Sequence, residues 1–275
     1  MLNRLKIICA FICVMIIQTT SAVFFTGEVL KEDNLKLIIL GDIHTTKANA
    51  ITTQQKKDIV TFSKKSNAYL IVEDFTKHEG TDPKINIELE GLDQIAHKFN
   101  MAGLCDLCSR ENIKSCSCEF RFSKSTDDVI KENEQTLNKL KAFDHPIAQK
   151  LLEIFWEKHN TLLAKNEYFK FNTDALFEFY TVYKFWKALQ ERSNTLFIIV
   201  VGAAHVRPIS QLIQIILKFN SVLRKNYFKM PDFLGSPEKN KELSNKMEKI
   251  TTDYALDLPQ FFDEALKAQP IRSRL

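Results

Sequence analysis

Two short segments of this 275-residue chain place a histidine three residues after a glycine, and each segment follows an apolar run. The first segment ends at His44 and the second at His205, and a third apolar run is followed directly by Glu73. Two imidazoles and a carboxylate can hold a divalent metal ion with an open position that activates water. Alternatively, the carboxylate can orient one histidine as a general base while the other histidine stabilises developing charge. Both arrangements suit hydrolysis, and the spacing alone favours neither.

The elements around these segments predict where the three side chains meet. Three apolar runs have the length of buried strands, at 35–40, 69–72 and 196–201. Residues 53–65, between the first two runs, carry a helical pattern, which predicts a right-handed crossover in a parallel sheet. The carboxyl ends of parallel strands share one edge, where ligands bind. The histidines and the glutamate are therefore predicted to face one site at that edge.

The pattern as a whole predicts an α/β protein with an open, mostly parallel sheet core and a large inserted helical region. The predicted core comprises residues 23–100 and 195–235. Residues 101–194 are predicted to form an insertion that contains cysteines and helices, because apolar residues recur there at helical spacing. A helical segment is expected over residues 236–275.

Residues close to these motifs are candidates for further roles, and each has a simpler structural alternative. Asp42 is a candidate substrate-binding residue or metal ligand, but an aspartate after a glycine also commonly forms an Asx-turn. Arg207 is expected to bind an anionic substrate group, unless it is solvated or paired with a carboxylate. Glu73 is also suited to be the acidic residue of a helix's first turn. Gly41 and Gly202 predict sharp backbone turns that leave room for a ligand.

Four cysteines lie close together in the pattern C-x2-C-x7-C-x-C, as Cys105, Cys108, Cys116 and Cys118. Clustered cysteines in an exported protein most often form disulfides, and four cysteines allow three connectivities. A bond between the last two would be geometrically strained, so we expect cross-pairs that close a small hairpin. A zinc knuckle is the alternative, although its second half would be C-x-C rather than C-x2-C.

The first 22 residues have the pattern of a secretory signal peptide, with two basic residues, an apolar run at 7–17 and small residues at 20–22. We therefore expect an exported protein, periplasmic or secreted. An uncleaved membrane anchor is the alternative and would be the expected route of membrane contact. The 38 basic and 34 acidic residues nearly balance, so charge gives no support to nucleic-acid binding. A small-molecule or peptide substrate is the expected partner.

Read together, the segments ILGDIHTT, LIVEDF and VVGAAHV resemble the TraB/Tiki group and the related ChaN- and erythromycin-esterase-like proteins. In that superfamily a Gly-x-x-His ends the first strand, a glutamate follows the second strand, and another Gly-x-x-His ends a late strand. The match implies His44, Glu73 and His205 as the catalytic or metal-binding residues. Members include exported metal-dependent proteases, ester hydrolases and haem- or iron-binding proteins. The resemblance thus implies an exported hydrolase or, alternatively, a non-catalytic binder of haem or iron.

A weaker resemblance is to calcineurin-like metallophosphoesterases, whose Asp-x-His opening matches Asp42 and His44. Those enzymes also need a later Gly-Asp and a Gly-Asn-His, and this chain has neither. A structural exported protein, in which the two histidines merely cap strands, is the remaining alternative. The leading prediction is an exported hydrolase whose water is activated by a divalent metal ion or by a glutamate-assisted histidine.

Overall fold

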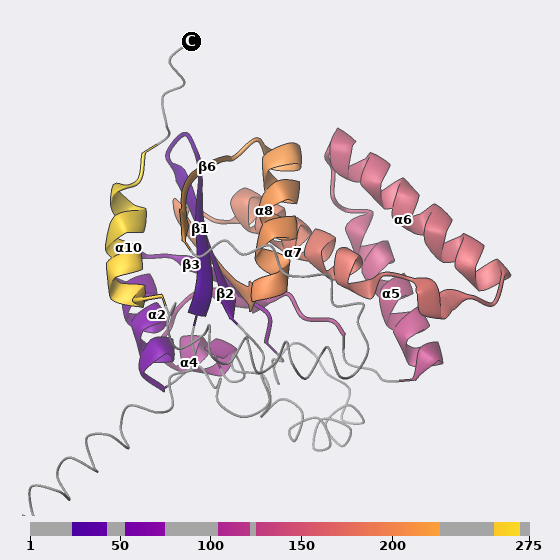
Figure 1. The fold of residues 1–275 in the computed structure, drawn as a ribbon, viewed down its shortest axis with the longest axis horizontal. Coiled ribbons are helices and arrows are strands. Elements are labelled where there is room, and N and C mark those ends of the chain that lie inside the picture. The colour runs from indigo at the N-terminus through magenta and orange to yellow at the C-terminus, as the bar shows by residue number, and fades with distance from the viewer. Residues whose placement is uncertain (1–23, 43–52, 75–103, 122–124, 226–255, 270–275) are drawn as a thin grey trace, which may run out of the picture.

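The computed structural model describes residues 24–42, 53–74, 104–121, 125–225 and 256–269 of the chain. Within these ranges a six-stranded sheet lies at the centre, with helices on both of its faces (Figure 1). The strands are β1 (Phe24–Glu32), β2 (Leu35–Asp42), β3 (Tyr69–Val72), β4 (Ser115–Ser117), β5 (Leu196–Gly202) and β6 (Asn220–Lys225). Across the sheet they lie in the order β4-β3-β5-β2-β1-β6.

The sheet is mostly parallel, which confirms the fold class predicted from the apolar runs. The strands β4, β3, β5 and β2 each run parallel to their neighbours in this half of the sheet. The strand β1 pairs antiparallel with both β2 and β6. Because β3 and β5 are covered on both faces, all their residues are buried and their sequences are continuous apolar runs.

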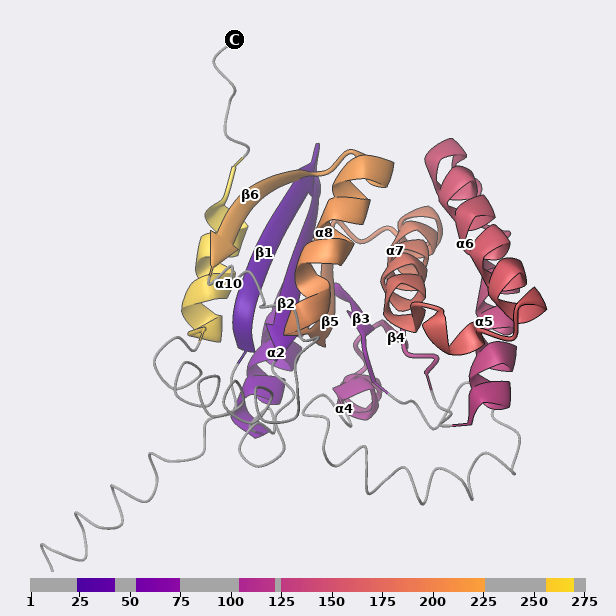
Figure 2. The ribbon, with the colours of Figure 1, turned by 45° about the vertical axis from the view of Figure 1, so that its right-hand side comes forward.

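The helices form layers on both sides of the sheet. They are α2 (Thr53–Ser66), α4 (Leu104–Arg110), α5 (Thr126–Leu140), α6 (Pro146–Ala164), α7 (Thr173–Glu191), α8 (Ala203–Leu217) and α10 (Leu258–Lys267). A short 3-10 helix at Tyr168–Lys170 precedes α7. Figures 1 and 2 show α2 and α10 on one face, α8 and α7 on the other, and α5 and α6 beyond α7. In the described ranges, no helix is both long enough and apolar enough to cross a membrane.

Alternating strand residues contribute to two separate cores, one on each face of the sheet. On β3, Ile71 belongs to the core beneath α7 and α8, whereas Val72 belongs to the core beneath α2 and α10. Side chains two residues apart on a strand share a face. Glu73 therefore continues the α7 side, two residues after Ile71. Asp42 continues the α2 side, because it lies two residues after Leu40 of that core.

The region predicted as an insertion, residues 101–194, supplies part of the sheet as well as helices. The strand β4 lies within it and pairs with β3, while α5, α6 and α7 form the expected helical layers. The helix α10 falls within the predicted C-terminal helical segment. The expected signal segment, residues 1–22, and the first part of that C-terminal segment, residues 236–255, lie outside the described residues.

Candidate active site at the carboxyl edge of the sheet

Glu73 follows β3 directly and lies against the amino end of α8. Its Oε2 accepts a hydrogen bond from the backbone N–H of Gly202 at 2.6 Å, and its Oε1 lies 2.5 Å from Nη2 of Arg121. Gly202 caps α8, so this carboxylate adds negative charge at the positive end of the helix dipole. Only 6% of the side chain is exposed. The backbone and guanidinium donors thus replace the water that a buried carboxylate loses.

Arg121 is the centre of the site and lies in the segment after β4. Glu119, two residues earlier, accepts hydrogen bonds from Nε at 2.9 Å and from Nη2 at 2.8 Å, which fixes the guanidinium plane. Asp174 accepts from Nη1 at 2.8 Å, and the Phe177 ring lies 3.9 Å from the guanidinium carbon. Burial alone would lower the pKa of Arg121, but the carboxylates of Glu119, Glu73 and Asp174 raise it above its ordinary value. The guanidinium is therefore a permanent, fixed positive charge.

His205 is the third residue of α8, and its ring is held from two sides. Its Nδ1 lies 2.9 Å from Oε1 of Glu178, and its Nε2 lies 3.5 Å from Nη1 of Arg121. The Phe177 ring, which packs against the guanidinium, also contacts this imidazole at a centroid distance of 4.8 Å. A carboxylate can only accept, so a neutral His205 carries its proton on Nδ1 and presents a lone pair at Nε2.

Two of the predicted site residues, Glu73 and His205, thus contact the same guanidinium group. The third, His44, lies outside the described residues. Asp42 is buried and continues the α2 side of the sheet after Leu40, although its backbone pairs with Gly202. Arg207 is exposed, and two residues of helix rotate it to the side of α8 opposite His205. The substrate-binding roles of Asp42 and Arg207 therefore remain predictions without support from this geometry.

Sequence reasoning missed four charged residues of the site: Glu119, Arg121, Asp174 and Glu178. None of them follows a glycine or a long apolar run, which were the features that marked the strand ends. Asp174 and Glu178 are spaced i and i+4 on α7, so they share one face of that helix. That spacing, and the Glu-x-Arg pair after the cysteines, are the signals that could have located them.

The described site residues do not fit a divalent metal ion. Both oxygens of Glu73 accept from N–H donors, and Nδ1 of His205 is held by Glu178. The other ring nitrogen, Nε2, keeps its lone pair but lies 3.5 Å from Nη1 of Arg121. A metal shared by this glutamate and histidine would lie beside the guanidinium, whose positive charge repels it. Nor do the described ranges contain a group of three or more side chains placed to hold a metal ion.

Gly41 serves close packing rather than the sharp turn that the sequence predicts. It lies inside β2, and a Cβ added there would meet the Cγ2 atoms of Thr26 and Val206 at 2.5 Å. The Cα of Ala203 would lie at 2.8 Å. A glycine is needed because the first turn of α8 crosses β2 at this point. Gly202 likewise has an ordinary backbone conformation, with φ −59°.

All four described cysteines are free thiols, where the sequence predicts disulfides. Cys105 and Cys108 lie in the core beneath α2, whereas Cys116 and Cys118 face the core beneath α7. The two pairs lie at the edge strand β4, and Cys105 interacts electrostatically with both Cys116 and Cys118. Cross-paired disulfides and a shared zinc ion therefore stay predictions. Burial also raises the pKa of the Cys105 and Cys118 thiols, and that of Cys108 to about 12.

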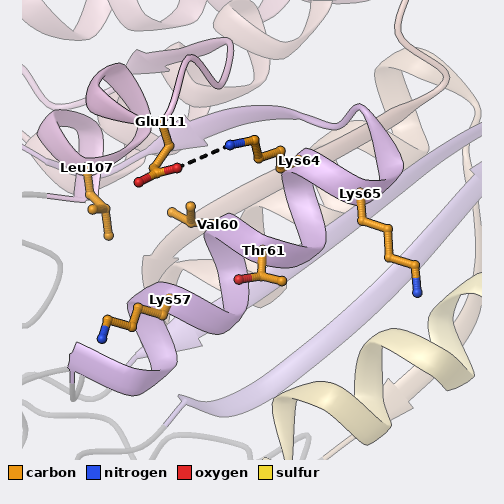
Figure 3. Close-up of a pocket in the computed structure, with 7 residues that line it drawn as sticks. All are labelled: Lys57, Val60, Thr61, Lys64, Lys65, Leu107 and Glu111. Carbon is orange, nitrogen blue, oxygen red and sulfur yellow. Dashed lines mark hydrogen bonds and ion pairs between the residues drawn. The ribbon is translucent and has the colours of Figure 1, made fainter.

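A groove of about 570 Å³ lies between α2 and the end of α4, on the opposite side of the sheet (Figure 3). Its lining residues are Lys57, Val60, Thr61, Lys64, Lys65, Leu107 and Glu111. Lys64 and Glu111 form an ion pair of 3.3 Å across it, and both side chains are exposed. Such exposed pairs contribute little to stability. Since none of its residues belongs to the Arg121 cluster, the groove has no part in the candidate site.

No protein family, curated protein or solved structure matches the chain. Membership in the superfamily that the three motifs resemble therefore stays a prediction. The function is inferred from the geometry of the site.

Proposed function

We propose that this chain is a hydrolase in which His205 is the general base. The observation behind this proposal is the 2.9 Å contact between its Nδ1 and Oε1 of Glu178. A carboxylate at Nδ1 orients the ring, leaves Nε2 to accept a proton from water, and stabilises the imidazolium that forms. The side chain of His205 is 12% exposed, so a water molecule or substrate can approach a largely desolvated base.

Arg121 supplies the positive charge that this reaction needs beside the base. Its Nη1 lies 3.5 Å from Nε2 of His205, so a carbonyl oxygen bound at Nη1 places the carbonyl carbon near a water at Nε2. As the water oxygen attacks that carbon, His205 takes the proton and the carbonyl oxygen gains negative charge. The guanidinium stabilises this oxyanion. The intermediate then collapses, and the leaving group departs with the proton from His205.

Glu73 and Glu119 act in this proposal as positioning residues. They bind Nε and Nη2 of Arg121 and leave Nη1 directed toward His205. Both carboxylates are at most 6% exposed, so the guanidinium is held by groups that cannot move into solvent. This is the preorganisation that electrostatic stabilisation of a transition state requires.

The proposal retains one branch of the sequence prediction, the histidine assisted by a glutamate. It differs in that Glu178, rather than Glu73, orients the histidine. It agrees best with the ester-hydrolase members of the superfamily that the motifs resemble. Export to the periplasm or the extracellular space is part of the proposal, on the strength of residues 1–22.

The test is turnover of a panel of nitrophenyl esters and short peptides by the purified protein. His205→Ala should lower kcat by about 10²–10⁴-fold, the usual contribution of a general base. Lys64→Ala is the matched control, because it changes an exposed charge on the opposite side of the sheet. Circular dichroism should show the same helix content in all three proteins.

Equal turnover by the wild type and His205→Ala would refute the general-base role. Activity that chelation abolishes and a divalent ion restores would instead favour the metal branch of the sequence prediction. A Soret band on haem titration, without turnover on any substrate of the panel, would favour the haem or iron binder.

A further inference from the structure

Asp174 differs from the other carboxylates on Arg121 in its exposure. Its side chain is 66% exposed, whereas those of Glu73 and Glu119 are 6% and 5% exposed. It lies in the first turn of α7 and makes a single contact with the guanidinium, from Oδ1 to Nη1 at 2.8 Å. The two buried carboxylates occupy Nε and Nη2. Asp174 is therefore the one partner among these three that can leave Arg121 by moving into water.

The atom that Asp174 occupies is also the one beside the general base. Nη1 of Arg121 contacts Oδ1 of Asp174 at 2.8 Å and faces Nε2 of His205 at 3.5 Å. In the proposed reaction, the attacked carbonyl oxygen binds this nitrogen. After hydrolysis of an ester or an amide, an oxygen of the product carboxylate occupies the same position. Asp174 thus carries the same chemical group as the acyl product, a carboxylate, and binds the same nitrogen of Arg121.

We propose that Asp174 is an internal competitor for the acyl group, and that the substrates are carboxylic esters or amides whose carboxylate product replaces it on Arg121. This inference rests on the proposed function and narrows it to acyl transfer to water. Charge favours an exchange of this kind, because one monoanionic carboxylate replaces another. The net charge around the guanidinium is then the same with Asp174 bound and with the product bound.

The proposal predicts that removing Asp174 exposes a carboxylate-binding site. Acetate is the probe, and protection against thermal unfolding at constant ionic strength measures its binding. If Asp174 occupies Nη1 most of the time, Asp174→Ala should bind acetate about ten-fold or more tightly than the wild type. Adding Arg121→Lys to this variant should abolish the gain, because lysine keeps the charge but lacks the planar fork.

Asp127→Ala is the matched control. Asp127 is the second residue of α5, as Asp174 is of α7, and both are acidic residues of a first helical turn. Each alanine variant loses the same kind of interaction with a helix dipole. A difference between the two variants in the acetate-induced shift of the unfolding temperature therefore reports the loss of the contact with Arg121. The control should respond to acetate as the wild type does.

Acetate protection of Asp174→Ala no greater than that of the wild type or the control would overturn the inference. Inorganic phosphate protecting Asp174→Ala as well as acetate does would also overturn it, because the site would then not select an acyl product. Either result would leave the proposed function standing if esters are still turned over. A gain for acetate without turnover on any ester or peptide would support the binding site and refute the hydrolase.

Discussion

Oε1 of Glu178 lies 2.9 Å from Nδ1 of His205, and this contact determines which ring nitrogen faces the site. The carboxylate comes from α7 and the imidazole from α8, so the packing of these two helices sets the distance. The neutral ring with a proton on Nδ1 has its lone pair directed at Nη1 of Arg121. The tautomer is therefore a property of the fold that can be measured without a substrate.

The first prediction concerns that tautomer. In the wild type, ¹⁵N NMR of the imidazole should report a proton on Nδ1 of His205. Glu178→Ala removes the acceptor, so the proton should redistribute toward Nε2, and kcat on any substrate found should fall by about 10-fold or more. An unchanged ¹⁵N pattern in Glu178→Ala would show that this carboxylate does not control the ring.

A second prediction concerns the charge balance around Arg121. Arg121→Met leaves the buried carboxylates of Glu73 and Glu119 without their cation. Removing one partner of a buried ion pair costs about 3–5 kcal/mol, so denaturant unfolding should show a loss of that order. Arg110→Met is the control, since Arg110 is exposed on α4 and should change stability by about 0.5 kcal/mol or less. Equal effects of the two changes would show that the cluster does not contribute to stability.

The third prediction tests the close approach of α8 to β2. Gly41→Ala places a Cβ within 2.5 Å of the Val206 side chain and 2.8 Å of the Ala203 backbone. Overpacking of this kind costs about 1–3 kcal/mol, measurable by urea unfolding. Gly27→Ala should cost less, because its Cβ would meet the far end of the Phe261 ring rather than a backbone.

Adding Val206→Ala to Gly41→Ala separates the two contacts. The smaller side chain removes one clash, so the double variant should lose less stability than the sum of the single changes. Strict additivity would mean that Val206 does not take up the strain, and that the Ala203 backbone determines the cost.

The fourth prediction follows from the buried thiols. The pKa of Cys108 is raised from its ordinary value of 9.0 to about 12, and those of Cys105 and Cys118 are also raised, chiefly by burial. Above about pH 9 the unfolded chain loses thiol protons that the folded protein keeps. The contribution of these thiols to the free energy of unfolding is therefore fully present below that pH. It falls as the pH rises above it, by about 1.4 kcal/mol per thiol for each pH unit.

Urea unfolding at pH 8, 9 and 10 measures that slope. Cys118→Ala should have a lower free energy of unfolding at every pH, because it leaves a cavity. Above pH 9, however, its free energy of unfolding should fall less steeply with pH, because one thiol fewer loses its proton on unfolding. Leu137→Ala is the control, because it leaves a cavity in the same core without removing a thiol. If Cys118→Ala keeps the wild-type slope, this thiol is not shielded in the folded state.

The strands and His205 could be predicted because the patterns that mark them lie within a few consecutive residues of the sequence. A strand covered on both faces reads as a continuous apolar run, and the residue after it lies at the edge of the sheet. This reasoning placed Glu73 and His205 at the same edge. The same reasoning placed Asp42 at the predicted site with Glu73 and His205. Strand side chains alternate between the two faces, however, and this alternation directs Asp42 to the α2 side of the sheet.

The rest of the site depends on tertiary contacts that leave little trace in the sequence. The strand β4 has three residues, Ser115–Ser117, and its place is fixed by pairing with β3 rather than by an apolar pattern. Arg121 follows this strand, so its position could not be predicted without it. Glu178 reaches His205 because α7 packs against α8, a contact between segments 27 residues apart. The disulfide prediction relied on clustering in the sequence alone, and the described thiols are free.

Arg121, at the centre of the site, lies in the segment that follows β4, the shortest strand of the sheet and one of its edges. Edge strands fray before the interior of a sheet does, and local opening costs less than global unfolding. Warming should therefore detach β4, with Glu119 and Arg121, while the helices still give a native circular dichroism spectrum. If the chain is the hydrolase proposed above, its activity should be lost at a lower temperature than its helical circular dichroism signal. Cooling should restore that activity without refolding of the whole chain.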